Sequence, residues 1–414
     1  MRVSGFRLRF VLPLILIALG QSGARLHAQS VAVLIQSLRD KAVAVRADAV
    51  ETLAKEAQTV GGKQRVRPAF NALMISLGDP VESVRKQALR ALSSISDRGD
   101  LPSLWTTLKD SNPNRRASAA TILGILGDKR SAEPLLKTIR DHEPEVRAAA
   151  MEALGSIGDP RVAEMALPLL RDQNPRVRLK TVMALGNLRE LKSAPNLIPL
   201  LKDGDPAVRR SAAVSLARIG NRTVVPALLE IMEANLPQDS FGIKFYAAYA
   251  LGALGEKRAV PTLIKGLKDQ DESVRVAAAN ALGLMNQTSA VPYLMESLFE
   301  KKSVLLRWTA AQALGNLRDR RAVPKLIKGL KDENEDVREQ SAKALGKIGD
   351  KSAVDSLIEV FKDADEAIPK AAVLALGRIG DKRALPAVKK LLSHKDATVR
   401  AAAEDVVKML ERNR

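Results

Sequence analysis

The sequence predicts an all-α protein, a solenoid of about twelve antiparallel helix pairs. A unit of about 31 residues recurs along most of the 414-residue chain, and each unit carries two amphipathic helical patterns separated by a polar turn. The apolar residues are mainly alanine, leucine, valine and isoleucine, while aromatic residues make up only 3%, as suits closely packed helices. A fixed period of this size is typical of solenoids, because each helix pair buries its apolar face only against its neighbours.

The first residues have the pattern of a signal peptide. Arg2, Arg7 and Arg9 precede an apolar stretch, residues 10–19, and a polar segment with small residues follows. We expect residues 1–28 to be removed by cleavage after Ala28, with Ala24 as the other candidate, leaving a periplasmic or extracellular protein. An uncleaved membrane anchor is the alternative, although the apolar stretch is short for a membrane span. No later segment has the length and apolar character of a transmembrane helix.

Composition limits the chemistry that the chain can perform. It contains no cysteine, which excludes disulfide bonds, thiolate catalysis and sulfur-ligated metals. Its formal net charge of +19 favours attraction to polyanions such as nucleic acid, lipopolysaccharide or acidic polysaccharide.

The unit at residues 319–349 shows the repeat most clearly, with helical patterns at 323–330 and 335–348. Asn112, Asn174 and Asp205 each precede a proline, which predicts an N-capping side chain and the start of the second helix. A Val-Arg dipeptide recurs at the start of the second helix. A small residue, a leucine and further apolar residues follow it at fixed distances and predict one buried helix face. The positions equivalent to its arginine are Arg46, Arg85, Arg116, Arg147, Arg178, Arg209, Lys244, Arg275, Arg307, Arg338, Pro369 and Arg400.

The ends of the array depart from this pattern. Residues 29–78 form a looser copy with a longer spacing and are expected to be an N-terminal capping repeat, followed by the regular array over residues 79–396. Residues 397–414 are expected to form a C-terminal capping helix, since Glu404 and Lys408 replace apolar and glycine residues of earlier copies.

The consensus resembles a known family. The motif Ala-Val-Pro-x-Leu-Ile, at residues 259–264 and 322–327, and the later Val-Arg-x-x-Ala-Ala-x-Ala-Leu-Gly pattern resemble HEAT-like repeats of the phycobilisome-lyase type over roughly residues 79–411. The resemblance implies a right-handed superhelix with the first helix of each pair, helix A, on the convex side and the second, helix B, on the concave side. It implies binding rather than catalysis, and nothing in the sequence marks a tetrapyrrole pocket.

Charged residues that recur in nearly every unit are interpreted as scaffold. An aspartate lies six residues before the repeated arginine, as in Asp110 with Arg116 and Asp141 with Arg147. Such groups would satisfy exposed helix N-termini and neighbouring carbonyls.

No catalytic, cofactor or metal site is predicted. Some enzymes built from such repeats hold a di-iron centre with several His-Glu pairs, but here the single pair, His142-Glu143, lies far from the other histidine of the repeats, His394. Phosphate-binding loops and nucleophile motifs are absent, and no small-molecule substrate is indicated. An enzyme of the HEAT-like lyase or hydroxylase type is the disfavoured third alternative.

The middle of the array differs by its aromatic residues, since seven of the ten that follow residue 28 lie between positions 241 and 308. Positions one, five and nine after the repeated arginine share one face of helix B, which we expect to be the concave surface. This face predicts a binding strip for a protein or extended peptide near residues 179–312. The alternative is that the rings fill space created by a four-residue insertion near residues 235–242. The predicted partner-binding residues are Leu179, Met183, Arg210, Phe245, Tyr246, Tyr249, Val276, Asn280, Leu284, Trp308 and Gln312, with Val214 on the same face; Glu339 and Lys343 follow in the next unit.

Basic residues in the turns between repeats form a second candidate surface, a basic edge that would bind an anionic polymer. Several have an acidic neighbour, so a solvated edge is the competing interpretation. The residues are Lys129, Arg130, Arg161, Arg222, Lys257, Arg258, Arg318, Arg320, Arg321, Lys382 and Arg383.

Overall fold

A computed structural model describes residues 23–234 and 242–412, and all regular secondary structure in these residues is helical. The all-α fold class is therefore confirmed for this part of the chain. The apolar stretch of the predicted signal peptide lies outside the described residues, whereas residues 23–28 belong to the first described helix. Of the helices described, none combines the length and the apolar character needed to cross a membrane.

Unit 1, Met1–Leu188, is the first of two compact units. Its 3₁₀ helices are η1 (Arg67–Ala69), η2 (Arg98–Asp100), η3 (Lys129–Ser131) and η4 (Leu167–Arg171). Its α-helices are α2 (Gly23–Ser37), α3 (Val43–Glu56), α4 (Gly62–Val66), α5 (Phe70–Ser76), α6 (Glu82–Ile95), α7 (Leu101–Thr107), α8 (Pro113–Leu126), α9 (Ala132–Thr138), α10 (Pro144–Ile157), α11 (Val162–Met165) and α12 (Pro175–Leu188). The expected capping repeat, residues 29–78, thus comprises most of α2 together with α3, α4 and α5.

Unit 2, Arg189–Arg414, is the second compact unit. Its α-helices are α13 (Ala194–Leu197), α14 (Pro206–Ile219), α15 (Val225–Glu233), α16 (Ile243–Leu254), α17 (Val260–Gly266), α18 (Glu272–Leu284), α19 (Val291–Ser297), α20 (Val304–Leu317), α21 (Val323–Gly329), α22 (Glu335–Ile348), α23 (Val354–Glu359), α24 (Ala367–Ile379), α25 (Leu385–Lys390) and α26 (Ala397–Arg412). Its 3₁₀ helices are η5 (Leu191–Ser193), η6 (Ile198–Lys202), η7 (Arg222–Val224), η8 (Lys257–Ala259), η9 (Thr288–Ala290), η10 (Arg320–Ala322), η11 (Lys351–Ala353), η12 (Val360–Lys362), η13 (Lys382–Ala384) and η14 (Leu391–Ser393).

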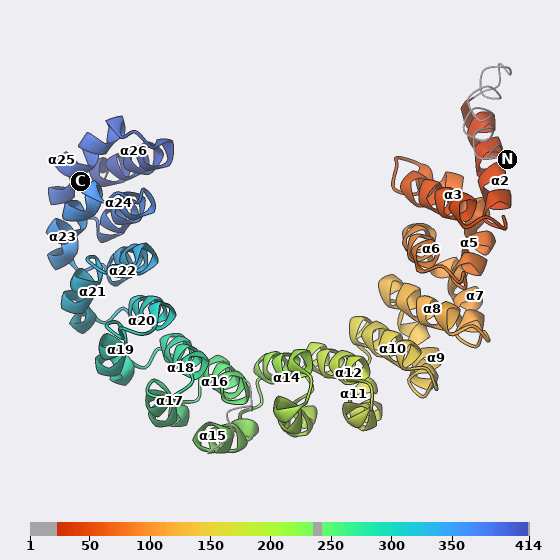
Figure 1. The fold of residues 1–414 in the computed structure, drawn as a ribbon, viewed down its shortest axis with the longest axis horizontal. Helices are drawn as coiled ribbons and strands as arrows, with labels where there is room; N and C mark the ends of the chain where they lie inside the picture. Colours follow the sequence, from red (N-terminus) through yellow and green to blue (C-terminus); the bar gives the residue numbers. More distant parts are fainter. Residues whose placement is uncertain (1–22, 235–241, 413–414) are drawn as a thin grey trace, which may run out of the picture. The chain divides into compact units, whose positions relative to one another are not determined.

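The helices form the predicted pairs. Each long helix B packs against the helix A that precedes it and against the B helices of neighbouring repeats within its unit. In unit 2, Figure 1 shows the B helices α16, α18, α20, α22 and α24 side by side, with the A helices α17, α19, α21 and α23 along the other side. The fold is an α-solenoid of about twelve helix pairs.

Local sequence signals explain where the B helices begin and end. The Asn112 side chain accepts a hydrogen bond from the backbone N–H of Asn114 at 2.9 Å, and Asp205 accepts from Ala207 and Val208. These contacts satisfy N–H groups that have no partner inside the helix. At the other end of α22, Gly349 adopts a φ of 76°, a left-handed conformation that favours glycine.

The A helices are less regular than the sequence predicts. The predicted helix at residues 323–330 corresponds to α21, which begins at Val323 and ends at Gly329, but a 3₁₀ turn that was not predicted, η10, precedes it. Asp319 begins this segment by accepting a hydrogen bond from the N–H of Arg321 at 2.9 Å. Helix A therefore starts as a tight 3₁₀ turn before it becomes an α-helix.

Neighbouring B helices approach one another closely where glycine faces alanine. A Cβ atom placed on Gly252 of α16 would lie 2.6 Å from the Cα atom of Ala281 on α18. A Cβ atom on Gly283 of α18 would lie 2.7 Å from the Cα atom of Ala313 on α20. Because non-bonded carbons cannot approach this closely without a shift, these two glycines set the separation of α16, α18 and α20.

Candidate functional site

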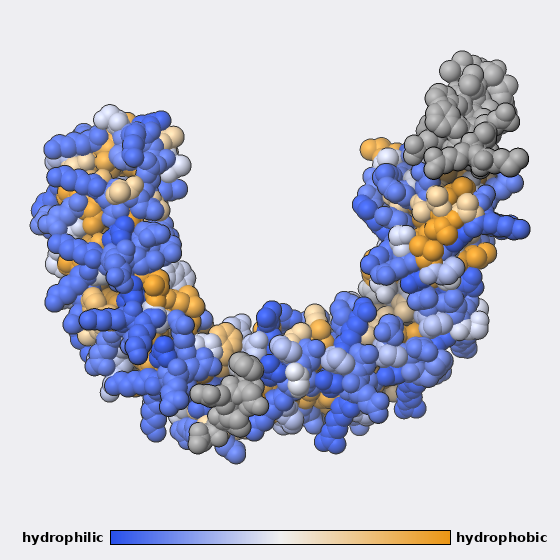
Figure 2. All heavy atoms as spheres, in the orientation of Figure 1, coloured by the Kyte–Doolittle hydropathy of each residue, from blue (hydrophilic) through white to orange (hydrophobic). Residues whose placement is uncertain are grey.

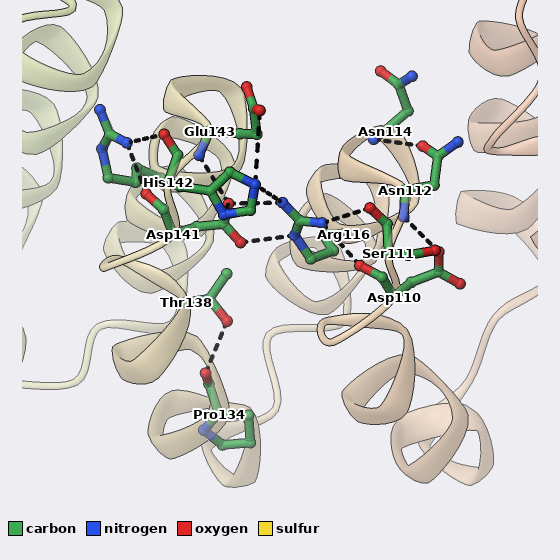
Figure 3. A network of polar contacts seen from close by, with 11 residues as sticks. Asp110, Ser111, Asn112, Asn114, Arg116, Pro134, Thr138, Asp141, His142 and Glu143 are labelled. Carbon is green, nitrogen blue, oxygen red and sulfur yellow. Dashed lines mark hydrogen bonds and ion pairs between the residues drawn. The ribbon is translucent and has the colours of Figure 1, made fainter.

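The repeated arginine connects one repeat to the next, as Figure 3 shows for Arg116. Its Nη1 donates hydrogen bonds to the backbone oxygens of Asp110 and Ser111, at 2.8 and 3.1 Å, within its own repeat. Its Nε and Nη2 donate to the two carboxylate oxygens of Asp141 in the following repeat, at 2.7 and 2.8 Å. The guanidinium thus bridges its own turn and the following repeat, and its hydrogen bonds to the turn carbonyls agree with the scaffold role predicted from the sequence.

The Asp141 carboxylate also accepts a hydrogen bond within its own turn. Its Oδ1 accepts a hydrogen bond from the backbone N–H of Glu143 at 2.9 Å. Burial acts to raise the pKa of Asp141, but the hydrogen bonds from Arg116 and from the Glu143 N–H outweigh burial and hold that pKa below its usual range. The carboxylate is therefore charged at neutral pH and serves the fold.

The same pairing recurs and then weakens within unit 2. Arg209 and Arg275 each have a buried Nε atom with no hydrogen-bond partner, although their Nη1 atoms still donate to the preceding turn. Between them, Lys244 replaces arginine and contacts Asp269 at 3.3 Å. The regular pairs, which we call the ladder, include Arg46–Asp79, Arg116–Asp141, Arg147–Asp172, Arg307–Asp332 and Arg338–Asp363. Within unit 2 the ladder is therefore weakened over α14 to α18.

His142 lies beside the ladder, where a metal ion would meet positive charge. Its Nε2 is 3.4 Å from Nη2 of Arg116 and 3.7 Å from the Glu143 carboxylate (Figure 3). Within residues 23–234 and 242–412, no group of three or more histidine, aspartate or glutamate side chains is placed to hold a metal ion.

A cavity of about 570 Å³ opens where the ladder is weak. Phe245, Tyr246 and Tyr249 of α16 form its aromatic wall, and the rings of Phe245 and Tyr246 meet edge to face with centroids 5.2 Å apart. The other lining residues are Arg210, Val214, Gly242 and Ser273.

A second cavity of about 220 Å³ adjoins the first, since Phe245 and Tyr249 line both. It lies over α16, α18 and α20, and its remaining lining residues are Val276, Ala277, Asn280, Leu305, Trp308, Thr309 and Gln312. We call the two cavities together the aromatic groove. Of the described residues that line the groove, Arg210 is the charged one.

The aromatic groove presents apolar surface to solvent. Tyr249 is 37% exposed and Leu305 is 53% exposed, while Phe245 and Trp308 are half-buried. Figure 2 shows apolar side chains gathered over α18 and α20 on the B-helix side of unit 2. Half-buried rings keep a fixed orientation and still offer contact area, as anchor residues of interfaces do.

A model of HEAT repeats matches the chain over residues 31–121, 101–174, 163–239, 236–305, 296–369 and 354–407. The chain belongs to the HEAT-repeat family. No protein of curated function matches its sequence.

Solved structures share the HEAT-repeat fold at low sequence identity. A structure of importin beta is 18% identical, with a TM-score of 0.63, over 92% of this chain and 57% of that chain. Kap95p in complex with RanGDP is 15% identical, with a TM-score of 0.62, over 92% and 56% of the two chains. Kap121p is 13% identical, with a TM-score of 0.59, over 97% and 55%. This HEAT-repeat protein thus spans little more than half the length of these structures, which show its fold.

Most of the residues predicted for partner binding lie in the aromatic groove. Leu284 is 54% exposed on α18 but lines neither cavity. Leu179 and Met183 lie on α12 in unit 1, half-buried and 42% exposed respectively. The predicted residues that the structure brings together are Arg210, Phe245, Tyr246, Tyr249, Val276, Asn280, Trp308 and Gln312.

The sequence prediction omitted Leu305 and gave too much weight to aromatic content. Leu305 lies two residues before the repeated arginine, and the apolar run at residues 304–306 could have indicated it. Tyr293 lies on α19, a helix A, and Phe299 lies just after it beneath the Lys325 ammonium, 5.4 Å from the ring centroid. Phe241 lies outside the described residues.

The basic edge is partly neutralised by its own carboxylates. Arg130, Arg161, Arg321 and Arg383 each pair with the aspartate two residues earlier, at 2.6–2.9 Å. The hydrogen bonds that Arg130 donates lower the pKa of Asp128 to about 2, so this partner is ionised at neutral pH. Such pairs reduce the field that the edge offers to a polyanion.

Proposed function

We propose that this HEAT-repeat protein is a non-catalytic scaffold that binds another protein, or an extended peptide, on the B-helix face of unit 2. The aromatic groove is the observation that carries the proposal, because it combines exposed apolar surface with partly fixed rings. Surfaces of this kind are typical of protein interfaces. Among solenoids of similar fold, Kap121p is described as bound to Ste12p and Kap95 as a complex with Nup1.

The paired cavities favour a ligand with two neighbouring apolar side chains. Phe245 and Tyr249 stand between the cavities and contribute to both. In an extended peptide, side chains on one face repeat every second residue, roughly 7 Å apart at about 3.3 Å per residue. One such side chain would enter each cavity, and the rings would cover both from the side.

The proposal is tested by partner capture followed by affinity measurement. Replacing Phe245 and Trp308 with alanine should weaken binding of a captured partner at least tenfold, because interface anchors each contribute more than about 1 kcal/mol. Phe299→Ala is the matched control, since Phe299 is an aromatic residue of comparable exposure, 39%, outside the groove. Circular dichroism confirms that each variant is folded. Equal affinity of the groove variant and the control for the partner would refute the assignment.

Salt dependence separates protein binding from the alternative, polyanion binding through the basic edge. Heparin retention that disappears at moderate salt, while partner binding persists, would favour the protein interface. Partner binding that falls steeply with salt and is unchanged by the groove variant would favour the basic edge instead.

We also propose that the protein is exported and that its repeats are of the phycobilisome-lyase type. The first proposal rests on the arginines and the apolar stretch within residues 1–28, and the second on the motif at residues 259–264 and 322–327. N-terminal sequencing of the protein from cell envelope or medium should give a chain that begins at residue 29, or at residue 25. An intact N-terminus would contradict cleavage.

A further inference from the structure

Three cations lie at the C-terminal ends of consecutive B helices of unit 2, and we call them the cation row: Arg318, which also belongs to the basic edge, Lys347 and Arg378. Arg318 follows α20, Lys347 lies in the last turn of α22 and Arg378 in the last turn of α24. None of the three forms an ion pair with a residue of the described chain. The Lys347 ammonium has a neutral partner, since it donates to Oδ1 of Asn316 at 2.9 Å.

Lys347 is the middle member of the cation row, between the B helices that carry Arg318 and Arg378. Burial lowers the pKa of Lys347, and the charges of Arg378, Arg318 and Lys343 lower it further. Lys343 is compensated by Glu339 at 2.7 Å, whereas the other three cations are not. The carbonyl ends of the helices attract cations, but they do not supply a full negative charge. The row therefore favours an external carboxylate.

The cation row continues the aromatic groove along α20. Trp308 and Gln312 line the groove, and Asn316 follows at the same four-residue interval, so the three residues share one helix face. Four residues of α-helix rise about 6 Å, which separates Gln312 from Asn316 along the axis. Because Asn316 holds the Lys347 ammonium, the apolar and cationic surfaces meet at this residue. In Figure 2, hydrophilic side chains cover α22 next to the apolar side chains over α20.

We propose that the partner segment is bipartite, with apolar side chains in the aromatic groove and adjoining carboxylates on the cation row. This inference rests on the proposed function and specifies the partner as an apolar–acidic peptide segment. Charge complementarity carries it, because Glu339, the nearby carboxylate, is already paired with Lys343. A nucleic acid fits less well, since a row of three cations is short for a phosphate backbone and aliphatic Val214, Val276 and Leu305 wall the cavities.

Selection of random twelve-residue peptides displayed on phage, with the full chain as target, tests the inference. Wild-type protein should enrich sequences with two apolar residues followed or preceded by aspartate or glutamate. The double variant Lys347→Gln and Arg378→Gln should keep the apolar preference and lose the acidic one. Glu339→Gln combined with Lys343→Gln, which removes both members of a neighbouring ion pair and frees no carboxylate, is the matched control and should keep both preferences.

The affinity of one enriched peptide for each protein variant, measured by fluorescence anisotropy, gives the size of the effect. The double variant should bind it at least tenfold more weakly than wild type, and the peptide with its carboxylates replaced by amides should bind both proteins equally. The amide peptide binds only through the aromatic groove, so weaker binding of this peptide to the double variant would reveal any general loss of fold. The comparison of the two peptides corrects for such a loss.

The outcomes distinguish the two proposals. Enriched apolar peptides without an acidic preference, or an acidic preference that the double variant retains, would overturn the bipartite partner and leave the groove in place. Absence of any enrichment that depends on Phe245 and Trp308 would overturn the groove and the inference together. Tight binding of a single-stranded twelve-nucleotide DNA that depends on Lys347 but not on Trp308 would assign the cation row to nucleic acid and refute the peptide.

Discussion

Replacing Asp141 with alanine is predicted to weaken the contact between two repeats of unit 1. The variant leaves the Arg116 guanidinium without both carboxylate oxygens, which now lie 2.7 and 2.8 Å from its nitrogens. The Arg116 and Asp141 side chains are only 6% and 11% exposed, so water replaces the lost contacts poorly. Removing one partner of a buried ion pair costs about 3–5 kcal/mol, and we expect about 3 kcal/mol because two backbone carbonyls still accept from Nη1.

Native-state hydrogen exchange is the appropriate assay, since an array of repeats opens locally as well as globally. Amides of α8 and α10, the helices on either side of this contact, should exchange faster by the factor that corresponds to the lost free energy. Asp159→Ala is the control, because its partner Arg161 is 55% exposed and the loss of such a pair matters little. Unchanged exchange in α8 and α10 would refute a stabilising role for the ladder.

The effect of Asp141→Ala should also depend on pH in a defined direction. The folded-state pKa of Asp141 is lowered, mainly by hydrogen bonds that outweigh burial, so its contribution is complete above the unfolded value of about 3.9. That contribution is lost as pH falls through the lower, folded-state pKa. The difference in stability between wild type and variant should therefore be full at pH 7 and shrink below about pH 4. A difference that stays constant down to pH 2 would contradict this account.

Two further changes test packing and capping in unit 2. Gly283→Ala should destabilise the contact between α18 and α20 by about 1–3 kcal/mol, because the added methyl group would lie 2.7 Å from the Cα atom of Ala313. Gly204→Ala, where a methyl group meets open space, should change stability by less than about 0.5 kcal/mol, and equal effects in thermal unfolding would contradict the packing argument. Asp205→Ala removes the acceptor for two N–H groups at the start of α14 and should cost about 1 kcal/mol, seen as faster exchange in that first turn.

The repeat period was sufficient to predict the helix pairs, because each repeat carries its own residues that start and end its helices. The predicted helix at residues 335–348 coincides with α22, whose start is capped by Asn334 and whose end is followed by Gly349. The 3₁₀ start of helix A was not predicted, since Asp319 and the residues after it are compatible with either helical form.

The side chains that pair in the ladder could not be predicted from the repeat. In the regular repeats an aspartate lies six residues before the arginine of its own repeat and 25 residues after the arginine of the preceding one, so spacing alone cannot decide which two side chains meet. Residues four apart share one face of a helix, and this spacing placed Phe245, Tyr249 and Trp308 on one side of the B helices. It did not predict that the groove is divided into two cavities. Phe245 and Tyr249 line both cavities, and the orientation of the Phe245 ring, edge to face with Tyr246, is a property of packing rather than of helical period.

The contact of Gly252 with Ala281, and of Gly283 with Ala313, has a consequence for selectivity. These contacts lie between the same three helices that carry the aromatic groove, and at each the backbone of one helix already touches its neighbour. The two cavities therefore cannot be moved closer together without a steric clash. The fixed separation of the cavities therefore selects a ligand by the interval between its apolar side chains as well as by their chemistry. Shortening that interval by one residue should weaken binding even when both side chains are kept.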